Sequence, residues 1–408
     1  MKTFYKYTPT ARRSGFTLVE LLVAAALTVL IMTVLATAFQ VGMQTLSHLK
    51  SVVGLSEQLR TAETIMRNDL GGVHLETALG DPVRVSDPRF ATNAWTNPGR
   101  GYFSVVNGSV TTSANYSYEG VEENVNSYRA VDHSVFFTTK RNGETNQDVY
   151  YGDAAGLPTT LSNQNLTDYA IGNQFVSKWA EIGYVLVPIP NVVTKNDDTL
   201  TTLQLYTLNR RQRALAPNAV ALDLLPTLGA PNANPNYYLA RYPEISISVQ
   251  PTPMLNAVPT INDVARAIVN DPVTITDINN RIMNQWNYDN ATPARVTAFG
   301  SISKNTLSAS ALKIGATLNT LFSSPTDKVG SDIVLNNVIS MQIRVMTKEG
   351  LVASQLYQDE LPASLGVYPR NLDTANGSGI ILRAIQIKLR VWDTKNSITR
   401  QLTITQDL

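Results

Sequence analysis

The first 80 residues combine a long apolar run with an apolar stripe at helical spacing. Residues 16–39 hold a single charged group, Glu20, in 24 positions, and a helix of that length would extend about 36 Å, enough to cross a bilayer. Because no proline occurs between Phe16 and Asp81, the pattern predicts one helix from Phe16 to the high seventies. Beyond the run, apolar residues recur at three- and four-residue spacing, at Leu46, Leu49, Val53, Leu59, Ala62, Met66 and Leu70.

The remainder of the chain shows the period-two alternation of β-strands. The clearest cases are residues 339–346 and 384–392, where every second side chain is apolar, as expected for a sheet with one buried and one solvated face. Residues 393–397 are predicted to turn into a last strand, 397–405, which would form an antiparallel hairpin with the preceding one. Earlier strands are predicted at 133–139, 147–151, 181–189 and 200–208, whereas residues 82–132 are predicted to be irregular.

Residues 211–330 differ in character from the strands on either side. Eight prolines fall within residues 217–259, which excludes a run of central sheet strands there. Two short helices are predicted after them, at 261–269 and 307–322. We therefore expect an α+β fold, in which a long N-terminal helix packs on an antiparallel sheet with a large irregular insertion. The expected segments are a basic leader (1–15), the helix (16–80), the first part of the β domain (81–210), the insertion (211–330) and the C-terminal strands (331–408).

Composition narrows the functional classes. The 33 basic and 32 acidic residues nearly balance, so no basic surface of the kind that binds nucleic acid is indicated. The absence of cysteine excludes disulfides, zinc–thiolate sites and thiol catalysis. The motifs HExxH, GxSxG and GxxxxGK are absent as well. We expect no enzyme, cofactor or metal site, and we expect His74 and His133 to lie at the surface or at strand edges.

Two loops group oxygen ligands that could hold calcium, at residues 195–198 and 287–290. Neither has the spacing of an EF-hand. Asp and Asn are also common turn residues, so the sequence favours ordinary turns at both places.

The segment before the apolar run is basic, with Lys2, Lys6, Arg12 and Arg13 and no acidic residue. A secretory signal peptide has the same order of basic and apolar parts, but this run is longer and no A-x-A-like cleavage site follows it. A membrane span is therefore favoured. A carboxylate inside a span costs roughly 2.5–3.5 kcal/mol by insertion scales, so Glu20 calls for a partner, unless the segment is a plain signal anchor with an incidental glutamate.

The stretch RRSGFTLVELLVAAALTVL resembles the class III signal of type IV pilins and pseudopilins. The resemblance implies that a prepilin peptidase recognises the leader with Arg12 and Arg13, cuts between Gly15 and Phe16, and methylates the new amine of Phe16. It also implies a role for Glu20 in filament assembly. Its charge would pair with the amine of Phe16 on a neighbouring subunit, which fits the physical need for a partner.

Five further stretches resemble the J-type family of minor pseudopilins: LSEQLRTAETIMRNDL (55–70), IGYVLVP followed by LQLYTLNRR, VLNNVISMQIRVMTKEG (334–350) and ILRAIQIKLRVWD (381–393). This resemblance implies a pilin-like fold and a non-enzymatic subunit that helps to initiate or cap a periplasmic pseudopilus for type II protein secretion. The implied location is the bacterial inner membrane, spanned once by residues 16–39, with the β domain in the periplasm.

The implied partners are the prepilin peptidase, other minor and major pseudopilins or pilins, and the inner-membrane assembly platform. One alternative is a minor pilin of a type IV pilus or DNA-uptake system. A second alternative, from a different class, is a membrane-anchored, β-rich binding protein. That version would retain the leader and would tolerate the loss of Glu20.

Overall fold

The structure, a computed structural model, describes residues 15, 17–91, 99–107, 118–122, 125–128, 133–145, 148–153, 170–171, 174–194, 202–216, 222–223, 242, 244–250, 266–276, 331–349, 352–353, 370–374, 380–393 and 398–408. It divides into two compact units, residues 1–54 and residues 55–408. Each unit is described by itself below.

One helix, α1, runs without interruption over the 53 residues Leu18–Leu70. The predicted continuous helix is confirmed, but the predicted end in the high seventies is wrong. Gly71 and Gly72 follow the last turn, and glycine is about 1 kcal/mol less favourable than alanine in a helix. The N–H of Gly71 still donates to the carbonyl of Arg67, at 2.9 Å, and the chain then leaves the helical path.

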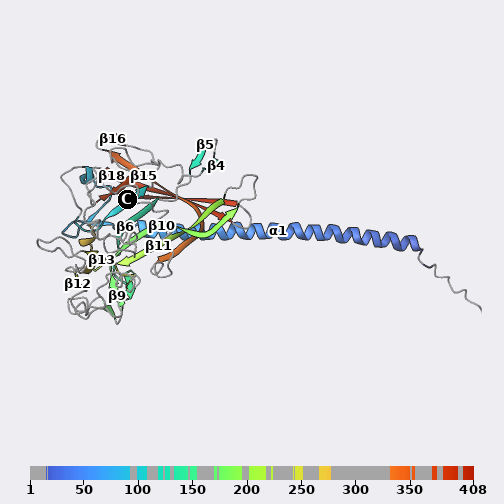
Figure 1. The fold of residues 1–408 in the computed structure, drawn as a ribbon, viewed down its shortest axis with the longest axis horizontal. Coiled ribbons are helices and arrows are strands. Elements are labelled where there is room, and N and C mark those ends of the chain that lie inside the picture. The colour runs from blue at the N-terminus through green and yellow to red at the C-terminus, as the bar shows by residue number, and fades with distance from the viewer. Residues whose placement is uncertain are drawn as a thin grey trace, which may run out of the picture. The chain divides into compact units, whose positions relative to one another are not determined.

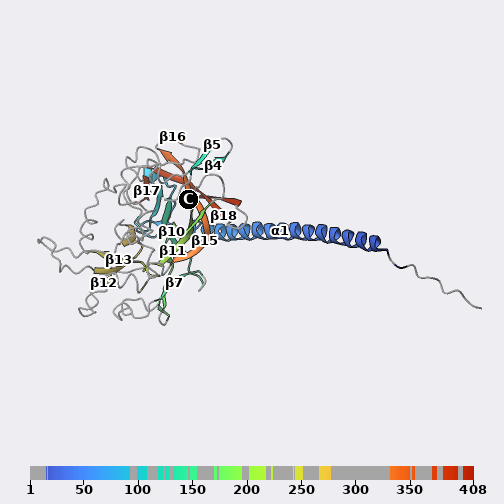
Figure 2. The same cartoon turned by 45° about the vertical axis from the view of Figure 1, so that its right-hand side comes forward.

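The second unit is built on a nine-stranded antiparallel sheet, whose strands β10, β11, β15 and β18 lie side by side (Figure 1, Figure 2). The sheet extends beyond these strands on both sides, and β16 (Val352–Ala353) pairs with β15 off the main order. In spatial order the strands are β17 (Arg370–Asp373), β3 (Phe103–Asn107), β6 (Ser134–Lys140), β10 (Trp179–Thr194), β11 (Thr202–Ala214), β15 (Ser331–Glu349), β18 (Ile380–Asp393) and β19 (Ile398–Asp407).

Smaller elements surround this sheet. They are the pairs β1 (Leu75–Glu76) with β2 (Pro82–Val83) and β4 (Tyr118–Glu122) with β5 (Val125–Tyr128), and the short 3-10 helices η1 (Pro88–Ala91) and η4 (Thr274–Thr276). Two three-stranded sheets join β7 (Tyr150–Asp153), β9 (Gln174–Ser177) and β8 (Ala170–Ile171), and β12 (Leu222–Asp223), β14 (Arg266–Val269) and β13 (Ile247–Gln250).

The core of the second unit lies between the end of α1 and one face of the large sheet. From α1 it takes Leu59, Ala62, Met66 and Leu70, spaced so that all four share one helical face. From the sheet it takes the alternating apolar residues of β15 and β18, among them Ile343 and Ile387. The predicted period-two strands are confirmed, as is the C-terminal hairpin, since β18 and β19 pair over the whole length of β19.

Two predictions of secondary structure are wrong. Residues 82–132 are not all irregular, because β3 lies within the large sheet between β17 and β6. In β3 Phe103, Ser104 and Val105 are all buried, so the strand lacks the alternation that would have marked it. The helix predicted at 261–269 is contradicted at residues 266–269, which form β14 and pair with both β12 and β13. The helix predicted at 307–322 lies outside the described residues.

The described parts of segment 211–330 are joined to the large sheet by a buried polar network. The carboxylate of Glu181, on β10, accepts hydrogen bonds from the Tyr102 hydroxyl at 2.5 Å and from Ser246 Oγ at 3.1 Å. Asn270 Nδ2 donates in turn to Ser246 Oγ at 3.0 Å. Arg213 lies opposite Glu181 in the β10–β11 register, and burial lowers its pKa to about 10, so it stays charged at neutral pH. This network fixes residues 244–248 and 270 against β10.

Candidate functional site

The predicted processing site is the start of the apolar helix. Gly15 is exposed, and a Cβ added to it would meet no atom within 4 Å. The described fold therefore does not require glycine at this position. Phe16 and the basic residues Arg12 and Arg13 lie outside the described residues.

Glu20 has a local partner that the sequence reasoning missed. Thr17 precedes the first residue of α1 and donates twice to Glu20 Oε2, from its N–H at 2.9 Å and from Oγ1 at 3.0 Å. The N–H of Glu20 donates back to Thr17 Oγ1 at 3.3 Å. This is the reciprocal capping box, for which Thr-x-x-Glu is a sequence signature. Both donated bonds use Oε2, and among the described residues no hydrogen bond reaches Oε1.

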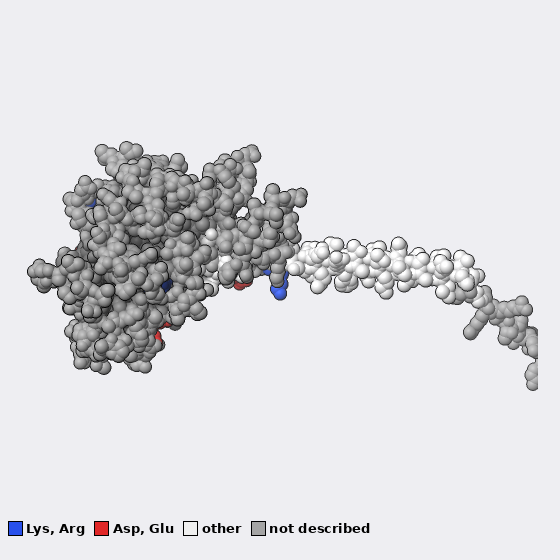
Figure 3. Space-filling view, viewed as in Figure 1, with Lys and Arg blue, Asp and Glu red and all other residues white. Residues whose placement is uncertain are grey.

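The helix after Glu20 is apolar on every side. All described side chains from Thr17 to Lys50 are exposed, and over most of this segment the visible face is white, without Lys, Arg, Asp or Glu (Figure 3). α1 is the one helix among the described residues that is long and apolar enough to cross a membrane. Four threonine hydroxyls of this segment donate to carbonyls one turn back, at 2.7–2.8 Å. They are therefore satisfied without water, as a lipid environment requires.

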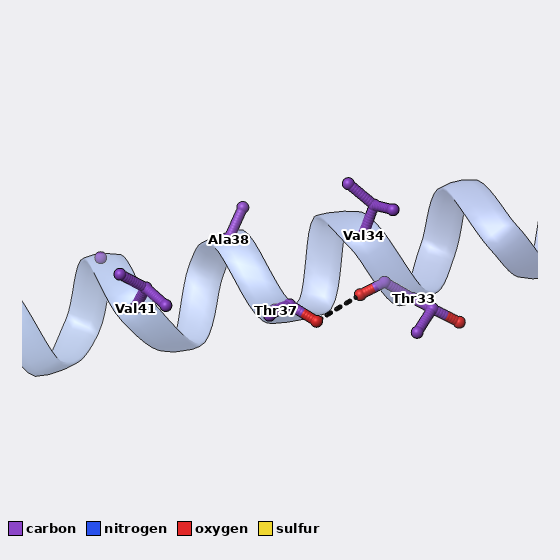
Figure 4. A pocket seen from close by; sticks show the side chains of 6 residues that line it. Thr33, Val34, Thr37, Ala38 and Val41 are labelled. Carbon is purple, nitrogen blue, oxygen red and sulfur yellow. Dashed lines mark hydrogen bonds between the residues drawn. The ribbon is translucent and has the colours of Figure 1, made fainter.

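A shallow groove runs along one side of this segment, lined by Thr33, Val34, Thr37, Ala38, Val41 and Gly42. Figure 4 shows its small side chains and the bond from the Thr37 hydroxyl to the Thr33 carbonyl. Small residues allow another helix to approach closely in a membrane. The groove holds no charged group and no free hydroxyl, so it can pack against another apolar surface but has no side chain suited to polar binding or catalysis.

The other end of α1 carries a buried polar cluster, here called the helix anchor: Asp69, Tyr184 and Arg210. The Tyr184 hydroxyl donates to Asp69 Oδ2 at 2.5 Å, and Arg210 forms a two-bond fork with the same carboxylate at 2.6 and 3.0 Å. The side chains of Asp69 and Arg210 are 4% and 12% exposed. The anchor therefore ties the last turn of α1 to β10 and β11 through largely buried, charge-assisted bonds.

Electrostatics keep Tyr184 neutral and Arg210 charged in the helix anchor. Burial, followed by the charge of Asp69, raises the pKa of Tyr184 well above its ordinary value, so the phenol remains a donor. For Arg210, burial opposes the charged form, but the hydrogen bonds and charge of Asp69 outweigh it and raise the pKa. Sequence reasoning singled out the segments that carry these three residues but had no means of bringing them together.

His74 and His133 were predicted at the surface or at strand edges. Both are buried, so the surface position is wrong, and they directly precede β1 and β6. His74 lies just beyond the end of α1, where its two ring nitrogens reach the carbonyls of Thr138 and Leu70 at 2.8 and 2.9 Å. His133 Nδ1 accepts from the N–H of Ile343 at 3.0 Å, and burial lowers the pKa of its ring to about 4. Each ring thus replaces water as the partner of a backbone group inside the core.

Within the described residues, no group of three or more His, Cys, Asp or Glu side chains is placed to hold a metal ion. The loops at 195–198 and 287–290 lie outside the part of the chain that the structure describes. The described residues thus form two sites: an N-terminal one around Gly15 and Glu20, and the helix anchor in the second unit.

Residues 10–36 match the family described as Prokaryotic N-terminal methylation motif. The match covers the leader end, Gly15, Phe16, Glu20 and most of the apolar run. Comparisons with curated proteins and with solved structures gave no match. The N-terminus is therefore of the prepilin type, which supports a type IV pilin-like protein with a membrane-anchoring N-terminal helix.

Proposed function

We propose that this chain is a minor pseudopilin of the J type, a structural subunit that helps to initiate or cap a periplasmic pseudopilus for type II protein secretion. The observation that carries the proposal is the coincidence of a prepilin-type methylation motif at residues 10–36 with an exposed Gly15 and with a carboxylate, Glu20, near the start of the otherwise uncharged run 16–39. A signal anchor needs neither Gly15 nor Glu20.

In this proposal the prepilin peptidase cuts after Gly15 and methylates Phe16. Glu20 then pairs with the amine of Phe16 on a neighbouring subunit. The capping box supports this role, because it holds the carboxylate through Oε2 while Oε1 lacks a hydrogen bond among the described residues. A charge that is held in a fixed position at low dielectric gains more interaction energy from an opposite charge than a mobile charge in water does.

The helix anchor supports the J-type assignment. The three segments that resemble this family before residue 330 contribute one member each: Asp69 from the end of α1, Tyr184 from β10 and Arg210 from β11. Each of these segments resembles the J-type family separately. Because their residues meet in one hydrogen-bonded cluster, they support the assignment better than they would if they were scattered over the fold.

The first experiment is mass spectrometry of the N-terminus after expression with a prepilin peptidase. A mature chain that begins at N-methylated Phe16 is expected, whereas Gly15→Val should retain the leader. Retention of the leader in the unmodified chain would reject the pilin-like reading altogether.

The second experiment is crosslinking in the native membrane, followed by identification of the partners. Other minor pseudopilins would support a secretion pseudopilus, and a major pilin with retraction components would move the protein to a type IV pilus. In the same assay Glu20→Ala should leave a stable, processed protein that no longer crosslinks to subunits. A Glu20→Ala variant that assembles normally would contradict the role given to this carboxylate.

A further inference from the structure

The outer edge of β19 ends the large sheet, and the proposed function gives it no role. β19 closes the large sheet at one end with ten residues, Ile398–Asp407. Natural proteins shield such an edge by shortness, proline, lysine or a bulge. β19 contains neither proline nor lysine, and its register with β18 is unbroken. At the other end of the sheet, β17 has only four residues.

The hydrogen bonds determine which backbone groups of β19 face outward. The N–H of Leu408 donates to the carbonyl of Arg383 at 2.9 Å, one step beyond the Ala384–Asp407 pair of the register. Hydrogen-bonded pairs alternate along an antiparallel ladder. The backbone groups of even-numbered residues from 398 to 406 therefore face β18, and those of odd-numbered residues from 399 to 405 face away from the sheet.

A contact from another element agrees with this alternation. Arg67 Nη1, on α1, donates to the carbonyl of Thr405 at 2.8 Å, which is possible only if that carbonyl faces away from β18. Arg67 thus covers one end of the edge. The next three outward-facing residues, Thr399, Gln401 and Thr403, all have exposed side chains. Each offers one N–H and one carbonyl, which together suit a partner strand of about five residues.

The charged side chains along this edge are mostly cationic. Arg400 is exposed on β19 itself, and Lys388 stands opposite Thr403 on β18. Arg390 stands opposite Gln401 and donates to its Oε1 at 2.9 Å. Arg67 lies at Thr405. The acids are fewer and lie at the margins. Glu63 is paired with Arg67 at 2.8 Å, Asp393 is buried, and Asp407 lies beyond Thr405. A strand that carries carboxylates is therefore the partner whose charge fits.

We propose that the outer edge of β19, from Thr399 to Thr403, binds an extended acidic segment of another protein by adding it to the sheet as a further strand. Backbone hydrogen bonds supply affinity in this mode of recognition, and alternate side chains supply specificity. Here the specificity comes from carboxylates next to Arg400 and next to the Lys388 and Arg390 pair. The inference holds whether or not the protein is a pseudopilin.

The test is residue-resolved amide hydrogen exchange on the full chain in neutral detergent micelles. The probe is an eight-residue peptide of alternating Glu and Val, and the control peptide alternates Lys and Val. The acidic peptide should slow exchange at the amides of Thr399, Gln401 and Thr403 about tenfold or more, and the basic peptide should not. Amides already protected without peptide, or protected equally by both peptides, would overturn the proposal.

Proline substitutions separate the edge from the ladder. Gln401→Pro removes an outward N–H that the β18 ladder does not use, together with one exposed side-chain bond from Arg390, so the domain should fold while the acidic peptide no longer binds. Leu402→Pro removes an N–H that the β18 ladder needs, and should destabilise the domain. Continued peptide binding by a folded Gln401→Pro variant would refute the proposal.

If Gln401→Pro fails to fold, a charge-reversal variant tests the proposal instead. Arg400→Glu changes one exposed side chain and should weaken binding of the acidic peptide about tenfold while improving that of the basic one. Equal binding before and after the change would reject an acidic partner. Sedimentation of the detergent-solubilised chain provides a separate check, since concentration-dependent dimers that Gln401→Pro abolishes would make a second copy the occupant and overturn the proposal.

Discussion

Replacement of Asp69 by alanine tests whether the helix anchor holds the end of α1 on the sheet. The carboxylate accepts three hydrogen bonds, one from Tyr184 and two from Arg210. Without it, the guanidinium of Arg210 stays 12% exposed beside the Gln212 amide and at 3.8 Å from Asp332, whose side chain is 79% exposed. Removal of one partner of a buried pair costs about 3–5 kcal/mol, a large share of a typical stability of about 5–15 kcal/mol.

The size of the effect should follow the number and charge of the bonds lost. Tyr184→Phe removes one bond to a charged acceptor and should cost about 1.5–3 kcal/mol, less than Asp69→Ala. Replacement of the pair together, by Asp69→Leu with Arg210→Met, should restore much of the loss because no unpaired charge remains. Glu63→Ala serves as the control on the same helix, since the Glu63–Arg67 pair is partly exposed and such pairs contribute about 0–1 kcal/mol.

The assay is urea unfolding of the full chain in neutral detergent, followed by tryptophan fluorescence. Trp179 and Trp392 are buried in the large sheet, so their emission reports the second unit and not the apolar helix. If Asp69→Ala shifts the free energy of unfolding no more than Glu63→Ala does, the anchor does not hold the helix end. If the double replacement is as unstable as Asp69→Ala alone, the loss does not arise from the unpaired charge of Arg210.

Three further predictions use the same preparation. The pKa of His133 is about 4 in the folded chain, against 6.5 without the fold, so on acidification the unfolded chain binds a proton before the folded chain does. The contribution of His133 to the free energy of unfolding should therefore be full above pH 6.5 and fall by about 3 kcal/mol as the pH drops to 4. His133→Asn should flatten this pH dependence in urea unfolding. Met66→Ala opens a cavity in the core and should cost about 2–5 kcal/mol, whereas Met43→Ala, on the exposed part of α1, should leave unfolding of the second unit unchanged. Thr17→Val removes both hydroxyl bonds of the capping box and should weaken the first turn of α1 by about 0.5–2 kcal/mol, seen as faster amide exchange at residues 18–21, while Thr17→Ser should not; equal exchange in the two variants would show that the box contributes nothing.

Features that depend on local pattern were predictable from the sequence. The continuous run of helix formers predicts α1, and alternation over eight or nine residues predicts β15, β18 and the final hairpin. The end of α1 differs from the prediction because the prediction rested on the absence of proline before Asp81, whereas the Gly71–Gly72 pair ends the helix. The capping box was missed although its Thr-x-x-Glu signature is visible, because Glu20 was considered only as an isolated charge.

Features that depend on distant partners were not predictable. β3 is short and buried on both faces, so only its pairing with β6 and β17 makes it a strand. β14 is a short apolar segment that would suit a helix, and its two neighbouring strands decide its state. The burial of the two histidines was not predicted because each has a backbone partner that is remote in sequence, Thr138 for His74 and Ile343 for His133.

The contacts at the end of α1 also govern when the domain can complete its fold. Asp69 meets Tyr184 and Arg210 at separations of 115 and 141 residues, and Arg67 meets Thr405 at a separation of 338. Contacts of such range form late, because the closure of long loops precedes any gain from them. During synthesis the helix therefore emerges before the strands that hold its end, and the bond from Arg67 to Thr405 cannot form until β19 has been made. Without β19 the helix end lacks this contact and the large sheet lacks its last strand, so deletion of β19 should shorten the lifetime of the protein in the cell.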